Sequence, residues 1–126
     1  MLEYEQVNSL GLIMSAIFYA AIGLKAVARP RSLLAAFGIV ADESASRNEI
    51  RAVYGGFPLT VSGLLILCLF NNSLSAGILT ALAACSAGMA AGRIVSAIID
   101  RSLGRAPAVF LIVEIAVAVA IASGIN

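Results

Sequence analysis

Long apolar runs separated by short polar breaks make up most of the chain between residues 9 and 122. The runs are apolar on every side, unlike the one-sided stripe of a soluble amphipathic helix, and about 20 such residues cross the core of a bilayer. They predict four spans, at residues 9–27, 47–70, 74–99 and 108–122. We therefore expect an all-α fold, an antiparallel up-and-down four-helix bundle in the membrane, with residues 1–126 as a single transmembrane domain.

The break after the first span predicts a short additional helix. Arg29-Pro30-Arg31 is expected to end the first helix, because a proline pushes the preceding residue out of the α region. Leu33, Leu34 and Phe37 then share one helical face and are followed by Gly38. This pattern predicts a short helix lying along the membrane interface.

Two further breaks carry signals for helix ends. Ser46 and Glu49 form a capping-box pattern, which predicts that the second span starts just after Ser46. Gly104 is the expected end of the third helix, and Pro107 is expected in the first turn of the fourth.

The composition agrees with an integral membrane protein. Of 126 residues, 61% are hydrophobic and 12% charged, against about 45–50% apolar and about 25% charged in soluble domains. The net charge is +1 without a long run of like charge, which argues against a nucleic-acid partner. Lys and Arg occur only in and beside the first and third loops, so the positive-inside rule predicts both termini outside the cytoplasm. No basic residue precedes the first run, so we expect a retained span rather than a signal peptide.

The chain has no histidine, which excludes His-ligated haem, His-based zinc sites and a Ser-His-Asp triad. We expect neither a metal site nor a cofactor. The two cysteines, Cys68 and Cys85, lie in apolar runs on adjacent spans. They are interpreted as small apolar packing residues, with a redox pair as the alternative.

Ionisable residues inside the spans are the main candidates for function, because charge is costly in hydrocarbon. Arg93 and Glu114 each lie about seven residues from the same loop, and so roughly 10 Å deep. Their helices are consecutive and antiparallel, so we expect the two side chains to pair. Lys25 and Arg51 lie near the same predicted side of the membrane.

A second group of candidates surrounds the proline of the second span. Arg51 and Tyr54 share one helical face with Gly55 and Pro58. Pro58 removes one helical hydrogen bond, and Gly55-Gly56 allows a helix or a ligand to approach the backbone. This face is expected to offer a free acceptor beside two donors.

Together these residues predict a polar pocket that opens to the cytoplasm within the bundle. Its expected ligand-binding residues are Lys25, Arg51, Tyr54, Arg93 and Glu114. Three cations against one carboxylate favour an anionic small molecule, a lipid headgroup or a carboxylate from a partner. The alternative is that Arg93–Glu114 only orients helices, while Arg51 lies among lipid phosphates.

Small residues predict where helices approach closely. Ala84, Gly88, Gly92 and Ser96 recur every four residues in the third span, and Gly88 to Gly92 is a GxxxG motif. The stripe packs either inside the bundle or against a second copy. Helix packing is thus expected at Gly55, Gly56, Gly88 and Gly92.

The run Asn48 to Gly56, the pair Gly92-Arg93 and Glu114 resemble a bacterial four-helix membrane family described as domain of unknown function 4345. That family is itself distantly similar to DoxX-like proteins. Its members often carry Asp-Gly-x-Pro after the third span, whereas here Asp100 precedes Arg101 and Pro107 is displaced. The resemblance implies a four-helix fold in the inner membrane and no assigned activity.

Three functions fit these observations. The favoured hypothesis is a non-enzymatic protein whose pocket binds an anionic or amphipathic small molecule and moves it across the bilayer. The alternative is an accessory subunit that packs its glycine stripe in a larger membrane complex or a homo-oligomer, surrounded by membrane lipids. An enzyme acting on a lipid through Glu114 or Tyr54 is the least supported, because few groups could carry a proton.

Overall fold

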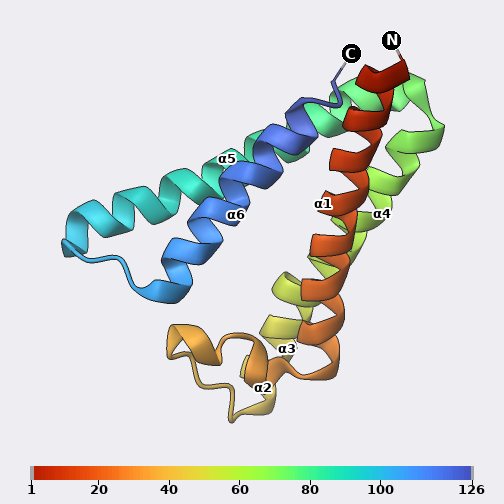
Figure 1. Ribbon diagram of the computed structural model, residues 1–126. Coiled ribbons are helices and arrows are strands. Elements are labelled where there is room, and N and C mark those ends of the chain that lie inside the picture. Colours follow the sequence, from red (N-terminus) through yellow and green to blue (C-terminus); the bar gives the residue numbers. More distant parts are fainter. Residues whose placement is uncertain (1, 126) are drawn as a thin grey trace.

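The computed structural model describes the backbone of residues 2–125 and the side chains of residues 9–125. All regular structure in this range is helical (Figure 1). Among the described residues, four helical stretches are long and apolar enough to cross a membrane. They are α1 (Leu2–Ala28), Ser44–Phe70, α5 (Asn72–Asp100) and α6 (Arg105–Ala122). The all-α four-helix prediction is confirmed, and the chain fits a multi-pass membrane protein.

The second of these stretches is built from three pieces. It begins with α3 (Ser44–Ile50), continues through a π-helical turn (Arg51–Gly56) and ends with α4 (Phe57–Phe70). Asn71 alone separates it from α5, so the break at residues 71–73 between the second and third predicted spans is shorter than expected.

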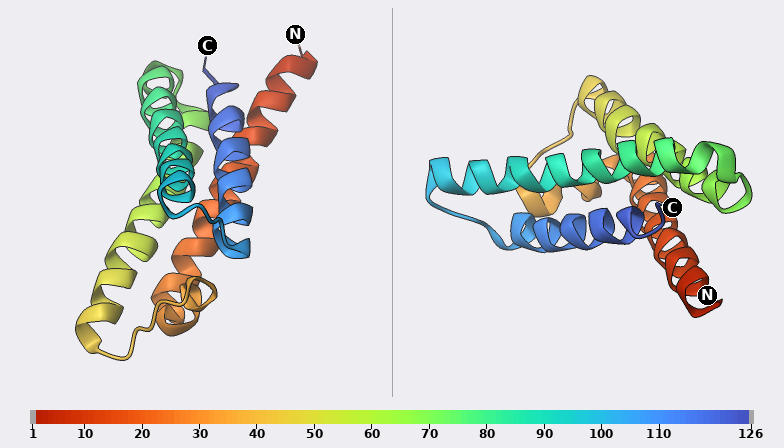
Figure 2. Two further views of the ribbon diagram at one scale, coloured as in Figure 1. Left: turned by 90° about the vertical axis from the view of Figure 1, so that its left-hand side faces the viewer. Right: turned by 90° about the horizontal axis from the view of Figure 1, so that it is seen from above.

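The long helices form two antiparallel pairs. The α3–α4 stretch lies along α1, and α6 lies along α5 (Figures 1 and 2). The pairs meet at the end of the molecule that holds the start of α1, the end of α6 and the turn between α4 and α5. Away from that end the α5–α6 pair diverges from α1 and α4, so the charged loops lie far from the shared core.

The main core lies where the two pairs meet and draws on all four helices. Its side chains are apolar and almost fully buried, and helices in lipid associate through such close van der Waals packing. They are Leu12, Ala16, Val61, Leu65, Cys68, Leu79, Val117 and Ile121. Large apolar side chains also cover the outer surface, for example Phe70, Ile98 and Ile112. Such a surface is suited to lipid rather than to water.

The segment after α1 carries a second, smaller core. It forms α2 (Pro30–Leu33) and a 3₁₀ turn (Ala35–Phe37), and Gly38 ends it with a positive φ of 73°. Leu34 is buried together with Ala26 of α1 and Ile50 of α3. The predicted short helix is therefore present as two short turns whose apolar side packs on the α1–α3 end of the molecule.

Glycines bring α1 and the second stretch into backbone contact. A Cβ on Gly23 would lie 2.9 Å from the carbonyl oxygen of Gly55 and 2.6 Å from Cγ of Leu59. A Cβ on Gly55 would lie 2.8 Å from Cγ2 of Val27. The packing role predicted for Gly55 is confirmed within the chain. Gly56 is exposed, and a Cβ there would meet only its own helix among the described residues, so packing of Gly56 against a partner stays a prediction.

The predicted capping box is wrong. Helix α3 begins at Ser44, two residues before Ser46, and no side chain caps its first turn. The guanidinium of Arg47 donates instead to the carbonyl oxygens of Ala41 (3.2 Å) and Asp42 (2.6 Å). These bonds hold the preceding loop against the helix, so the helix can start earlier than the capping pattern suggests.

The end of α5 also differs from the prediction. Arg101, not Gly104, adopts the left-handed conformation, with φ of 51°. This conformation lets the amide of Ser102 bond to the carbonyl of Ala97 (3.2 Å). Gly104 has an extended backbone and precedes α6, while Pro107 lies in the first turn of α6 as predicted.

Candidate functional site

Arg51 begins the π-helical turn and bonds to the end of α1. Its Nε donates to the carbonyl oxygen of Val27 at 3.0 Å. Val27 belongs to the last turn of α1, where carbonyl groups lack partners within their own helix. A cation is also favourable at this end of the helix dipole. Arg51 therefore caps α1, and its exposed side chain does not point to a shared pocket.

Pro58 is accommodated by widening the helix. In the turn before it the chain is π-helical, and the amide of Phe57 bonds five residues back to the carbonyl of Ala52. The hydroxyl of Thr60 donates to the carbonyl of Gly56 at 2.9 Å. Pro58 itself is buried. The disturbance that the sequence predicts is thus an extra-wide turn, a feature often found at functional sites.

Lys25 and Tyr54 do not join the other candidates. Both side chains are exposed, and neither makes a side-chain hydrogen bond or an ion pair with residues 9–125. The predicted convergence of five polar residues from four helices does not occur, because the α5–α6 pair diverges from α1 and from the π-helical turn. Of the five, only Arg93 and Glu114 are joined by a side-chain hydrogen bond or an ion pair within residues 9–125.

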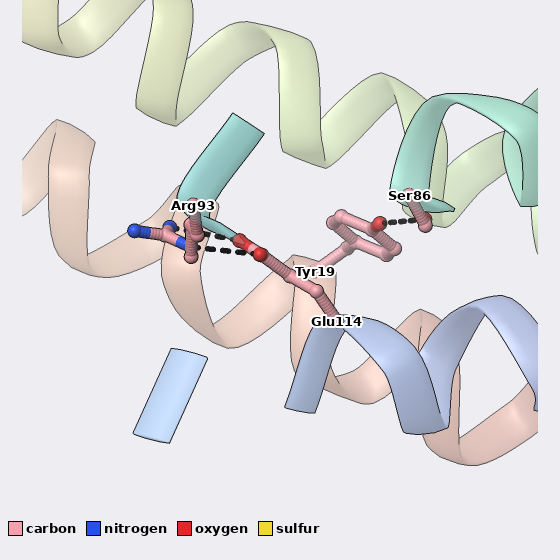
Figure 3. Close-up of polar contacts among 4 residues, drawn as sticks. All are labelled: Tyr19, Ser86, Arg93 and Glu114. Atoms are coloured by element: carbon pink, nitrogen blue, oxygen red, sulfur yellow. Dashed lines mark hydrogen bonds and ion pairs between the residues drawn. The ribbon is translucent and has the colours of Figure 1, made fainter. Parts of the chain in front are cut away.

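The pair Arg93–Glu114 is bidentate, as Figure 3 shows. Nε of Arg93 donates to Oε2 of Glu114 at 2.7 Å, and one terminal nitrogen donates to Oε1 at 2.8 Å. The Glu114 side chain is 4% exposed and that of Arg93 is 24% exposed. The predicted pairing is confirmed, in the planar fork-to-carboxylate geometry that gives strong hydrogen bonds.

Two aromatic rings hold the same guanidinium from other sides. Cζ of Arg93 lies 5.7 Å from the ring centroid of Phe37 and 5.5 Å from that of Phe110. The two rings lie 5.3 Å apart. These distances suit cation–π attraction. Phe37 therefore joins the segment after α1 to the α5–α6 pair, a role that its position in the sequence does not reveal.

Part of the Arg93 guanidinium remains available. A guanidinium carries five N–H groups, and Glu114 accepts two of them. The other three have no acceptor among residues 9–125, and the outer nitrogen points away from Glu114 (Figure 3). Arg93 lines a cavity of about 520 Å³ between α5, the following loop and the start of α6. Its polar lining side chains are Arg93, Ser96, Asp100 and Ser102.

A second polar contact lies deeper on the same face of α5. The hydroxyls of Tyr19 and Ser86 are 2.8 Å apart, linking α1 to α5. Ser86 is two helical turns before Arg93 on α5. In Figure 3 the carboxylate of Glu114 lies between the guanidinium of Arg93 and the ring of Tyr19. Tyr19 was not among the predicted site residues, although a hydroxyl in an apolar run needs a partner when it is buried.

Residues 7–124 match the family model described as Domain of unknown function (DUF4345). The chain belongs to this family. No curated protein and no solved structure matches the chain. The more distant similarity to DoxX-like proteins stays a prediction. Because the family description gives no activity, the function of this DUF4345 protein has to be argued from its site.

The charge balance of the DUF4345 site differs from the expectation. The cavity is lined by one cation, Arg93, and one carboxylate, Asp100, and Glu114 lies directly behind Arg93. The expected surplus of positive charge is therefore not gathered here, because Lys25 and Arg51 lie elsewhere. Both oxygens of Glu114 accept hydrogen bonds from Arg93, which does not favour a role for Glu114 as a general base.

The glycine stripe of α5 is exposed, and its end at Gly92 and Ser96 borders the cavity beside Arg93. Cβ atoms on Gly88 and Gly92 would meet no atom of the described chain within 4 Å, and Ala84 and Ser96 are exposed as well. The interpretation that this stripe packs inside the bundle is wrong, because α5 turns its other faces to α4 and α6. Packing against a partner stays a prediction.

The remaining candidate chemistry is limited. Cys68 and Cys85 are both free; Cys68 is buried in the main core and Cys85 is exposed. Among residues 2–125, no three His, Cys, Asp or Glu side chains lie together in a way that could hold a metal ion.

Proposed function

We propose that this DUF4345 protein is a non-enzymatic membrane protein whose cavity beside Arg93 binds a small amphipathic molecule. The observation that carries the proposal is the guanidinium of Arg93. Glu114, Phe37 and Phe110 orient it, while three of its N–H groups have no acceptor among residues 9–125. Donors fixed in advance lose little freedom on binding, which favours affinity.

The cavity is an open groove with room for a small molecule. Its volume of about 520 Å³ lies within the usual range for ligand pockets, and four of its ten lining residues, Arg93, Ser96, Asp100 and Ser102, are polar or charged. Apolar side chains, including Met89, Leu103 and Pro107, complete the lining. This mixture suits a molecule with one polar end and one apolar end.

The proposal includes the membrane in which the protein lies and its orientation there. Following the positive-inside rule, we place the protein in the inner membrane with the charged loops in the cytoplasm and both termini outside. The cavity, bounded by the loop after α5, would then open at the cytoplasmic side. Movement of the ligand across the bilayer is the functional consequence that we propose.

Native mass spectrometry of protein extracted in a mild detergent tests the binding proposal. We expect a bound mass with the wild type, and its loss with Arg93→Gln combined with Glu114→Gln. The double substitution removes the site without leaving an unpaired buried charge. Arg31→Gln is the matched control, because Arg31 is an exposed arginine outside the cavity. Retention of the mass by a folded double variant would refute the proposal.

The exposed stripe of α5 favours a second function, that of an accessory subunit. Gly88 lies on the outer surface with open space above it, which allows a partner helix to approach closely. Gly88→Leu should then release a protein that co-purifies with the wild type. Gly63→Leu is the control, because Gly63 has equally open surroundings on α4. Isolation of the wild type alone, from native membranes, would contradict this function.

A further inference from the structure

The cavity beside Arg93 contains charges of both signs. Arg93 lines it from the middle of the C-terminal half of α5, and Asp100 lines it from the last residue of the same helix. Among residues 9–125, the carboxylate of Asp100 forms no ion pair. A ligand in this cavity therefore meets a cation at one place and an unpaired carboxylate at another.

The two groups lie in line along the helix. They are seven residues apart, which places them on one face of α5 about 10 Å apart along its axis. In Figure 3 the outer nitrogen of Arg93 lies on the side opposite Ser86 and Glu114. The free donors of the guanidinium and the carboxylate of Asp100 thus belong to one cavity.

The charge balance discriminates between ligand types. A doubly charged anion would meet repulsion from Asp100 and from Glu114 behind the guanidinium. An uncharged molecule would gain nothing from the carboxylate of Asp100, which is exposed. Arg101 and Arg105 are exposed nearby and attract anions, but neither lines the cavity. A group that carries an acceptor and a cation satisfies both ends of the site, and mismatched charge disfavours its competitors.

Building on the proposed function, we infer that the cavity binds a phosphate ester that carries an ammonium group. The phosphate accepts from the free N–H groups of Arg93, and the ammonium lies at Asp100. A phospholipid headgroup and a soluble phosphate ester share this chemistry. The apolar lining at Leu103 and Pro107 favours the lipid.

The test compares two lipids on the same protein. Phosphatidylethanolamine and phosphatidylglycerol are added in equal amounts to delipidated protein, and native mass spectrometry measures the bound ratio. We expect the wild type to retain about three times more phosphatidylethanolamine, since an ion pair at an exposed carboxylate is weak. Asp100→Asn should bring the ratio to about one without loss of total lipid. Asp42→Asn, at an exposed aspartate outside the cavity, should leave the ratio unchanged.

Each result separates the two proposals. A wild-type ratio of one or below, or a ratio that Asp100→Asn leaves unchanged, overturns the inference while Arg93-dependent binding still stands. Lipid retention that survives the double substitution at Arg93 and Glu114 overturns the proposed function as well. Excess glycerophosphoethanolamine, which is the same headgroup without acyl chains, then identifies the source of the ligand. If it displaces the bound lipid, the ligand is a soluble ester. If the lipid stays bound, the ligand is the membrane lipid, and both outcomes keep the inferred headgroup.

Discussion

The two members of the Arg93–Glu114 pair should not be equally costly to remove. The Glu114 side chain is 4% exposed, whereas the Arg93 side chain is 24% exposed and borders the cavity. After Arg93→Met, the carboxylate, which is 4% exposed in the intact pair, loses both of its donors. After Glu114→Leu, the guanidinium can still be hydrated from the cavity. We therefore expect Arg93→Met to be the more destabilising change.

The magnitudes follow from the two hydrogen bonds of the pair. Breaking a buried ion pair from one side costs about 3–5 kcal/mol, which sets the expected loss for Arg93→Met at about 4 kcal/mol. Glu114→Leu should cost about 2 kcal/mol, because the remaining charge is partly solvated. The double variant contains no buried charge and should lie within about 1 kcal/mol of the wild type.

Unfolding by sodium dodecyl sulfate in mixed micelles, followed by circular dichroism, measures these free energies. The double-mutant cycle gives the coupling between the two residues directly. Arg31→Met is the control and should change stability by no more than about 0.5 kcal/mol. Equal costs for the two single changes, or a double variant that shows simple additivity, would refute the argument from burial.

Three further predictions follow from other contacts. Gly23→Ala should lower the free energy of unfolding by about 1–3 kcal/mol, because the added Cβ would meet a backbone carbonyl. Gly63→Ala is the control and should not destabilise, because a Cβ at Gly63 has open space. Equal effects of the two changes in the same unfolding assay would contradict the predicted contact. Tyr19→Phe should cost about 1 kcal/mol through the lost hydroxyl contact with α5, and unchanged stability would show that the contact contributes nothing. A maleimide in detergent should label Cys85 well before Cys68, measured by mass spectrometry, and the reverse order would contradict the burial of Cys68.

Hydropathy and the lengths of the loops were enough to predict the four long helices and the pairing of Arg93 with Glu114, because both depend on segments that are close in the sequence. Four apolar runs located the four long helices, because an unpaired backbone is too costly in lipid for any other form of these runs. The loop between α5 and α6 is short, so residues at equal distances from it face each other. This symmetry is why the pairing of Arg93 with Glu114 could be predicted.

The arrangement of the two helix pairs could not be predicted in the same way. Helices in a membrane gain little from burying apolar side chains against each other, so a uniformly apolar run does not reveal which face is inside. The predicted site placed Lys25, Arg51 and Tyr54 beside Arg93 on the assumption of a closed bundle. Divergence of the α5–α6 pair leaves the three without a direct contact to Arg93, and Gly88 is exposed because it lies on a face of α5 that is turned away from α4 and α6.

Contacts between distant segments were equally hidden. Arg51 bonds to the carbonyl of Val27, which no spacing of side chains could indicate. Phe37 reaches Arg93 across 56 positions of the sequence because the turn after α2 ends below the start of α6. Only the three-dimensional path of the connecting segment determines these partners.

Because the two helix pairs share their main core at one end, the α5–α6 pair acts as a lever arm. Leu79 lies in that core, and Asp100 lies 21 residues further along α5, about 30 Å away at 1.5 Å per residue. A rotation of about 5° at the core would move the far end of the arm by about 3 Å. Phe37 touches the arm near that end. All residues that line the cavity belong to the arm, so such a rotation would carry the cavity as a unit and would change only the contact between Phe37 and Arg93.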